Sequence, residues 1–232
     1  MSSEKSHNGI GTLRESSLHA ALKERLKQPG DQCEVNLDGY MIDLVRQDDT
    51  LVEIQTGSFS HIRRKLENLL HIHTVQLVYP IAENKWIVRK GKDGKQLRRR
   101  KSPKHGKWID VFTELVYITD WITHPNFNLM LVKTEEDEIW EDDGKGSWRR
   151  KYWSKTDRKL LDILEGYTLE KPEDYITLLP ENLSEPFTTR QLSETCGCRM
   201  RLAQQMAYTL FNAGLLERTG KSGRSHLYQK TD

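Results

Sequence analysis

Apolar residues in the first third of the chain recur first at helical and then at strand spacing. Leu18, Leu22 and Leu26 recur every four residues, which predicts a helix over Thr12–Lys27 that stops at Pro29-Gly30. Four short runs with strand character follow, and a helical segment separates the last two. The predicted strands are Cys33–Leu37, Tyr40–Val45, Leu51–Thr56 and Thr74–Ile81, and the predicted helix is Ser60–Leu70.

The connections between these segments indicate a fold class. Asp38-Gly39 between the first two runs is typical of a tight β-hairpin. A helix between two strands predicts a crossover, and therefore a mixed sheet with helices packed on it. We expect an α/β domain over residues 10–146, with a mixed sheet flanked by helices.

The rest of this expected domain has weaker signals. Trp86–Arg89 and Lys107–Thr119 predict further strands or a long hairpin, and Phe127–Lys133 predicts another strand. The acidic stretch Glu135–Ser147 also contains glycine, which predicts a linker or loop at the end of the domain.

A second, smaller α+β domain is expected over residues 147–232. Ser154–Leu164 predicts a helix, with Ser154 as its N-cap and Gly166 as its stop. Thr188 and Gln191 have the spacing of a capping box at the start of another helix.

The last 45 residues have a recognisable order of elements. A helix over Thr189–Thr195 and a turn at Gly197 precede a longer helix over Arg199–Asn212. A basic hairpin, Leu215–Thr219 paired with Ser225–Gln229, follows. This order resembles the winged helix-turn-helix family.

The resemblance implies binding to DNA. In such a module the exposed N-terminal side chains of the second helix reach base edges, and the wing contacts phosphates. The side chains in these places are Arg199, Arg201, Gln204 and Gln205 on the helix, and Arg218, Lys221 and Arg224 on the wing. A winged helix that serves protein contact or dimerisation is the alternative.

Charge is segregated along the chain, although the net charge is only +2. Basic residues crowd residues 85–107 and acidic residues crowd residues 135–143. Within the basic stretch, Arg98, Arg99 and Arg100 either bind duplex phosphate or form a solvated hairpin. The three cysteines indicate neither a disulfide framework nor a zinc site. Neither a secretory signal nor a 20-residue apolar run is present, so we expect a cytoplasmic protein without membrane contact.

Several polar side chains share faces with apolar residues in the predicted N-terminal elements. Strand alternation puts Glu53 and Gln55 on one face with Leu51, and it puts Asp43 on a strand with apolar neighbours. Glu15 shares a helix face with Leu18. Buried carboxylates are costly unless they are paired or bind a metal, and carboxylates from neighbouring elements can hold Mg²⁺. A turn residue at Asp43 and a solvated sheet face at Glu53 are the alternative.

Residues Thr12–Ile81 resemble the PD-(D/E)XK nuclease superfamily, which has a restriction-endonuclease-like fold. The family core is helix, three strands, helix, strand, and Glu15, Asp43 and Glu53-Ile54-Gln55 occupy its acidic positions. The resemblance implies that Asp43 and Glu53 ligate Mg²⁺ or Mn²⁺ with help from Glu15. Gln55 replaces the family's lysine, and Lys65 or Arg64 is expected to supply the missing charge.

The combined expectation is a metal-dependent DNA endonuclease that a winged helix brings to DNA. Its catalytic residues would be Glu15, Asp43, Glu53, Gln55 and Lys65. Many proteins of this fold act as dimers, so we expect a homodimer. The glycine spacing around Lys221 does not match a phosphate-binding P-loop, so no nucleotide cofactor is expected. The alternative function is a catalytically inactive DNA-binding regulator or scaffold. Defence, restriction and repair are all compatible with the sequence.

Overall fold

The computed structural model describes residues 16–144, 146, 148 and 152–231 of the chain. Its first elements are α1 (Ser17–Leu26), β1 (Gln32–Leu37), β2 (Tyr40–Val45), β3 (Leu51–Ile54), η1 (Phe59–His61), α2 (Arg63–Leu69), β4 (Val75–Lys90) and β5 (Gln96–Lys101). They are followed by η2 (Trp108–Val111), α3 (Phe112–Leu115), β6 (Phe127–Glu141), β7 (Ser154–Leu169), α4 (Pro172–Ile176), α5 (Thr189–Cys196), α6 (Met200–Asn212), β8 (Leu216–Ser222) and β9 (Ser225–Lys230).

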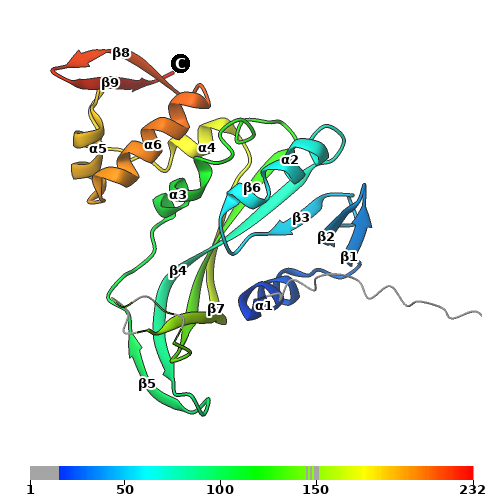
Figure 1. Ribbon diagram of the computed structural model, residues 1–232. Coiled ribbons are helices and arrows are strands. Elements are labelled where there is room, and N and C mark those ends of the chain that lie inside the picture. Colours follow the sequence, from blue (N-terminus) through cyan, green and yellow to red (C-terminus); the bar gives the residue numbers. More distant parts are fainter. Residues whose placement is uncertain (1–15, 145, 147, 149–151, 232) are drawn as a thin grey trace, which may run out of the picture.

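A mixed sheet organises the chain from β1 to β7 (Figure 1). Its strand order is β1-β2-β3-β4-β6-β7, and β5 pairs with β4. β4 runs parallel to both β3 and β6, whereas the other neighbours are antiparallel. Because α2 lies on the crossover from β3 to the parallel strand β4, the predicted α/β architecture with a mixed, helix-flanked sheet is confirmed.

The predicted N-terminal elements form for local reasons. Ser16 caps α1 with its hydroxyl group, and Leu18 and Leu22 of this helix are fully buried against one face of the sheet. Asp38 and Gly39 join β1 to β2 with φ angles of +51° and +80°. Two consecutive left-handed residues match the twist of the hairpin they connect.

The opposite face of the sheet shares one apolar core with the C-terminal helices. Leu77 of β4, Leu66 of α2 and Phe112 of α3 are fully buried in the same cluster as Met206 of α6 and Leu192 of α5. The C-terminal part is therefore packed onto the sheet through apolar contacts.

β4 is longer than predicted. The expected strands at Thr74–Ile81 and Trp86–Arg89 are two parts of one 16-residue strand, which bulges between Ala82 and Asn84. β3 pairs with the first part of β4, and β5 pairs with the last part.

Two predictions beyond β4 were wrong because pairing with distant residues overrides local pattern. The expected linker Glu135–Ser147 begins inside β6, which continues to Glu141, and the expected helix Ser154–Leu164 is part of β7. β6 and β7 are antiparallel neighbours along most of their length. Gly166, the expected helix stop, lies inside β7. The boundary expected at residue 146 therefore falls between two paired strands of one sheet.

The expected strands over Lys107–Thr119 are also wrong, since this segment forms η2 and α3. Phe112, Leu115, Ile118 and Ile122 are buried and recur every three or four residues. This is helical spacing, and it decides the structure despite the β-branched residues in the segment.

The C-terminal elements follow their predicted order of two helices and a hairpin. Thr188 and Gln191 form the expected capping box at the start of α5. Gly197 ends this helix in the left-handed region, with φ of +57°. The apolar stripe of Leu202, Met206 and Leu210 on α6 is buried, and β8 pairs with β9 in a hairpin.

Candidate functional site

A polar site forms where β2 and β3 diverge. Their registered pairs are Leu44 with Val52 and Val45 with Leu51. Beyond these pairs the Asp43 side chain takes the place of a backbone acceptor for Ile54 of β3. Asp43 Oδ2 accepts the Ile54 N–H at 2.8 Å. The end of the ladder thus holds this carboxylate between the two strands.

His19 of α1 contacts the same carboxylate oxygen. Its Nε2 lies 3.1 Å from Asp43 Oδ2. Burial alone would raise the pKa of Asp43. The hydrogen bond and charge of His19, with the Ile54 N–H, outweigh burial and hold that pKa below its usual value. Asp43 is therefore ionised at neutral pH.

Glu53 of β3 is in a different electrostatic state. It is only 6% exposed, and it forms an ion pair with Lys65 of α2. Lys65 Nζ also donates to the Met41 carbonyl oxygen at 2.5 Å. Burial raises the pKa of Glu53 to about 7, the negative charge of Asp43 adds to this effect, and Lys65 opposes it. The site therefore pairs one carboxylate that ionises readily with one that ionises near neutrality.

Gln55 lies directly after β3 and supports the chain where it leaves the sheet. Its Nε2 donates to the Ser58 carbonyl oxygen at 2.8 Å, and its backbone N–H donates to the Val78 carbonyl oxygen at 2.9 Å. The amide thus shapes the turn into η1. The cation at Glu53 comes from Lys65 on the following helix.

The structure brings together three of the five expected catalytic side chains, namely Asp43, Glu53 and Lys65. Glu15 lies outside the described residues. His19 was not predicted, although it follows Glu15 by four residues within the helix that the sequence predicts over Thr12–Lys27. That spacing was the available signal for a further polar group at the site.

The oxygens of Asp43 and Glu53 are the donor type that Mg²⁺ and Mn²⁺ prefer. Within the described part of the chain, Asp43 accepts both of its hydrogen bonds at Oδ2, and the Lys65 contact is at Glu53 Oε1. No group of three His, Cys, Asp or Glu side chains suited to a metal occurs among those residues. The donor set fits two protein ligands with the remaining positions left to water.

The residues expected to bind DNA in and beside α6 differ in exposure. Arg201 and Gln204 are exposed, and so is Tyr208, which follows them at helical spacing and is 54% exposed. Gln205 is half-buried, and it lines a cavity with Arg199 and Arg201. Tyr208 was not predicted, although the 3.6-residue period places it beside Gln204.

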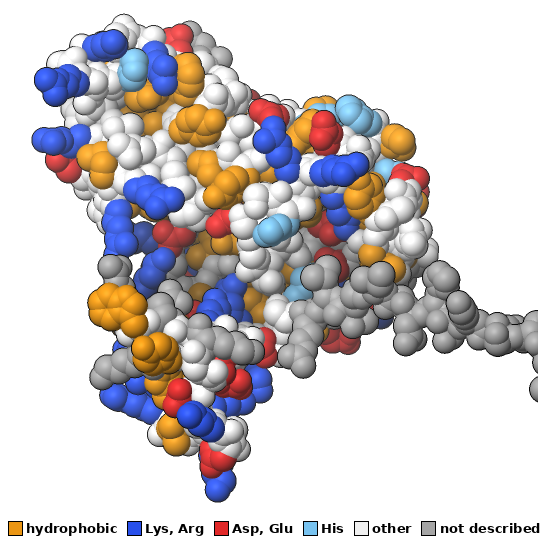
Figure 2. Space-filling view, viewed as in Figure 1, with side chains coloured by type: hydrophobic (Ala, Val, Ile, Leu, Met, Phe, Trp, Pro, Cys, Tyr) orange, Lys and Arg blue, Asp and Glu red, His pale blue; other side chains and the backbone are white. Residues whose placement is uncertain are grey.

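The β8–β9 hairpin carries three expected DNA-binding residues in two settings. The Arg218 guanidinium lies 4.2 Å from the centre of the Phe211 ring and 5.6 Å from that of Tyr228. It therefore ties the hairpin to α6. Lys221 and Arg224 are exposed near the hairpin turn. Figure 2 shows Lys and Arg side chains gathered over this end of the molecule.

The three arginines of β5 also divide between two faces. Arg99 donates to Asp137 at 3.0 Å and lies over the Trp86 ring at 4.6 Å. Arg98 and Arg100 lie on the opposite face around a shallow hollow with Arg89. The Arg98 and Arg100 side chains therefore lie on the face of β5 opposite to Arg99 and its partner Asp137.

An α/β protein with paired carboxylates at diverging strands is the class that this fold and site define. Residues 16–170 match the model of the family described as "Domain of unknown function (DUF8091)", and the chain belongs to this family. The match ends directly after β7 and includes Asp43, Glu53 and Lys65.

Similarity to another protein extends beyond the family region. An "Uncharacterized protein" of Treponema pallidum (strain Nichols) is 33% identical over 222 residues, which cover 95% of this chain and 87% of the relative. No solved structure matches the chain. In the described residues, no helix combines the length and apolar character that a membrane crossing needs.

Proposed function

We propose that this chain is a metal-dependent DNA endonuclease of restriction-endonuclease-like fold. The observation that carries the proposal is the convergence of Asp43, Glu53 and Lys65 where β2 and β3 diverge. The order helix, three strands, helix and parallel strand also supports it, because this is the core that the PD-(D/E)XK resemblance implies.

Asp43 and Glu53 are the residues that would hold Mg²⁺ or Mn²⁺. Such a metal supplies a Lewis acid for the phosphate and lowers the pKa of bound water. Lys65 is placed to donate a charged hydrogen bond to a phosphate oxygen near Glu53. The side-chain amide of Gln55 carries no positive charge and cannot take this role. Asp43 stays ionised through His19 and the Ile54 N–H, so the site retains a negative charge for a cation.

The C-terminal helices and hairpin support DNA as the substrate. In the proposed winged helix, Arg201, Gln204 and Tyr208 of α6 face the major groove. Lys221 and Arg224 contact the flanking phosphates. A homodimer would present two such modules and cut both strands.

The experiment is a cleavage assay on supercoiled, linear and branched DNA with Mg²⁺, Mn²⁺ or EDTA. We expect metal-dependent cutting that Asp43→Asn, Glu53→Gln and Lys65→Met each abolish. Arg64→Met is the matched control, because Arg64 is the exposed neighbour of Lys65 on α2. Equal activity in the Lys65→Met and Arg64→Met variants would exclude the role given to Lys65.

A catalytically inactive DNA-binding scaffold is the second candidate. Gln55 favours it, because its side chain is engaged with Ser58 and carries no charge. This function predicts DNA binding by the wild-type protein without cleavage under any metal, and unchanged binding by the Asp43→Asn variant.

A further inference from the structure

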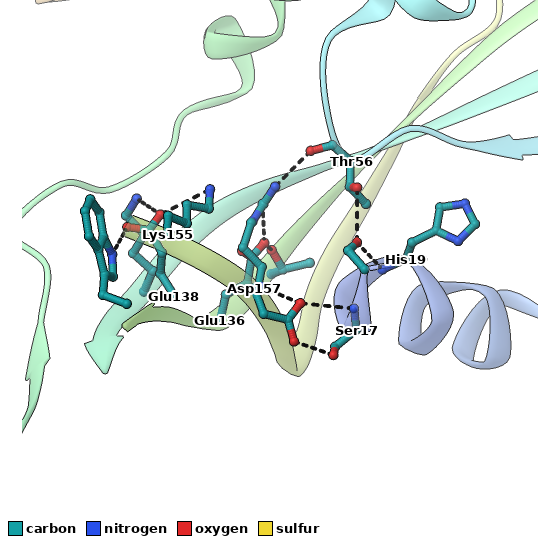
Figure 3. Close-up of polar contacts among 12 residues, drawn as sticks. Ser17, His19, Thr56, Glu136, Glu138, Lys155 and Asp157 are labelled. Atoms are coloured by element: carbon teal, nitrogen blue, oxygen red, sulfur yellow. Dashed lines mark hydrogen bonds and ion pairs between the residues drawn. The ribbon is translucent and has the colours of Figure 1, made fainter. Parts of the chain in front are cut away.

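A second polar cluster lies beside the N-terminus of α1, where β6 and β7 run past the end of β3 (Figure 3). Glu136 is only 1% exposed and accepts hydrogen bonds from Arg158 Nε at 2.7 Å and Nη2 at 2.9 Å. Arg158 Nη1 donates to the Thr56 carbonyl oxygen at 3.0 Å. Because Thr56 closely follows Glu53 in sequence, this arginine joins the cluster to the carboxylate site.

Two lysines in this cluster share one carboxylate oxygen. Glu138 Oε2 lies 2.9 Å from Lys85 Nζ and 3.5 Å from Lys155 Nζ, while Glu138 Oε1 accepts the Trp140 indole N–H at 2.8 Å. Each ammonium group has three donors, so the pair has more donors than Glu138 can accept. The arrangement has capacity for another anion.

The electrostatics of Lys155 agree with this excess. Burial of the ammonium group lowers the pKa of Lys155, the charges of Arg158 and Lys85 lower it further, and Glu138 opposes them. A bound anion would relieve the repulsion between these cations.

The cluster borders a cavity of about 250 Å³. Lys85, Lys155 and Arg158 line it with Lys104, which comes from the segment after β5. Lys104, Asp110 and Thr113 also line a larger cavity, of about 620 Å³, in front of the N-terminus of α6. The two cavities adjoin at these residues, and together they extend from α6 to the strands β4, β6 and β7.

We infer that the smaller cavity is a phosphate-binding subsite for a nucleic-acid strand that follows the path formed by the two cavities. Lys85, Lys104 and Lys155 donate to the oxygens of an internal phosphodiester. This subsite rests on the nucleic-acid substrate of the proposed function, and it specifies where the nucleic-acid strand crosses the protein. A purely structural role explains one cation at Glu138, but it does not explain a second lysine there and a third across the cavity.

Two neighbouring substitutions test the subsite by opposite effects. Lys155→Gln removes a donor, whereas Glu138→Gln removes the competing anion. We expect Lys155→Gln to weaken binding of a fluorescent oligonucleotide about three- to tenfold and to lower the salt slope by about one, and Glu138→Gln to tighten binding. Lys159→Gln, an exposed lysine on the same strand, is the control and should change neither.

Binding is measured in EDTA, so that the result does not depend on cleavage, and thermal unfolding checks that each variant is folded. Weaker binding in both the Lys155 and Glu138 variants would indicate a structural role and overturn the inference, as would no change in either. Wild-type binding without cleavage would reject only the nuclease, whereas no binding at all would reject both proposals.

The type of phosphate is tested with strands that carry or lack a 5′-phosphate. A Lys155→Gln effect of equal size on both strands is expected for an internal phosphodiester. An effect confined to the 5′-phosphorylated strand would overturn the continuous path and assign the cavity to a strand end.

Discussion

Glu53→Gln is predicted to stabilise the folded protein at alkaline pH and to have a much smaller effect at pH 5. Burial raises the pKa of Glu53 from 4.5 to about 7. The folded state therefore binds this proton more tightly than the unfolded chain does. As pH rises from 4.5 to 7, the unfolded chain loses this proton while the folded state still keeps it, so the free energy of unfolding falls. Above pH 7 the folded carboxyl group also ionises, and the loss levels off.

The size of the effect follows from the shift. One pKa unit corresponds to about 1.4 kcal/mol, so the ionised Glu53 costs on the order of 3 kcal/mol. The attraction of Lys65 is already contained in this shift. Glutamine keeps the shape of glutamate and retains an acceptor for Lys65, so most of the cost is expected to disappear in the variant.

Urea unfolding in EDTA at pH 5, 6, 7 and 8 measures the difference. The free energy of unfolding of Glu53→Gln should exceed that of wild type by an amount that grows from under about 1 kcal/mol at pH 5 to about 1–3 kcal/mol at pH 8. Glu67→Gln, at an exposed position on α2, should show no such trend. A difference independent of pH, or a less stable variant at pH 8, would refute the reasoning.

Three further substitutions test the fold around the site by unfolding measurements. Asp43→Asn should cost about 1–3 kcal/mol at pH 7 and less as pH falls below 3.8 through the lowered folded pKa; an equal cost at pH 3 would contradict this. Arg158→Met should cost about 3–5 kcal/mol because Glu136 is left buried without its arginine partner, and a silent change would contradict the contribution given to this ion pair. Met206→Ala should cost about 2–5 kcal/mol and lower the unfolding midpoint of sheet and C-terminal helices together, whereas two separate transitions would oppose a shared core.

Elements fixed by adjacent residues were predictable from the sequence. The turn at Asp38-Gly39 needs two left-handed residues, and the capping box needs only Thr188 and Gln191. In both cases the interacting groups lie within four residues of each other. Local pattern therefore carries the information.

β6 and β7 were not predictable in this way, because their stability comes from pairing across the chain. Taken alone, the acidic residues of β6 have the composition of a loop. In the folded protein Glu136 forms an ion pair with Arg158 of β7, and Glu138 forms one with Lys85 of β4. These partners are more than 20 residues away. A single sequence shows the charges but not which of them are neighbours.

The site was predictable in part for the same reason. Strand alternation identified Asp43 and Glu53, because the burial of each side chain depends on the two-residue period of its own strand. The contact of Lys65 with Glu53 depends on how α2 crosses the sheet, and the contact of His19 with Asp43 depends on how α1 packs. Helix packing therefore determines which cation serves which carboxylate.

The burial of Glu53 separates the two proposed functions. All four residues of β3 are buried, so an apolar side chain at this position would avoid the cost of ionising a carboxylate. Folding alone gives no reason for Glu53, since replacing a buried ion pair with apolar groups is often neutral or stabilising. A chemical role does give a reason, because a divalent cation offsets the same cost. If Glu53→Gln is more stable and loses a cleavage activity that wild type has, the stability was given up for catalysis. If wild type cuts no DNA and the Glu53→Gln variant binds DNA equally well, Glu53 serves neither cleavage nor DNA binding, and the scaffold function is favoured.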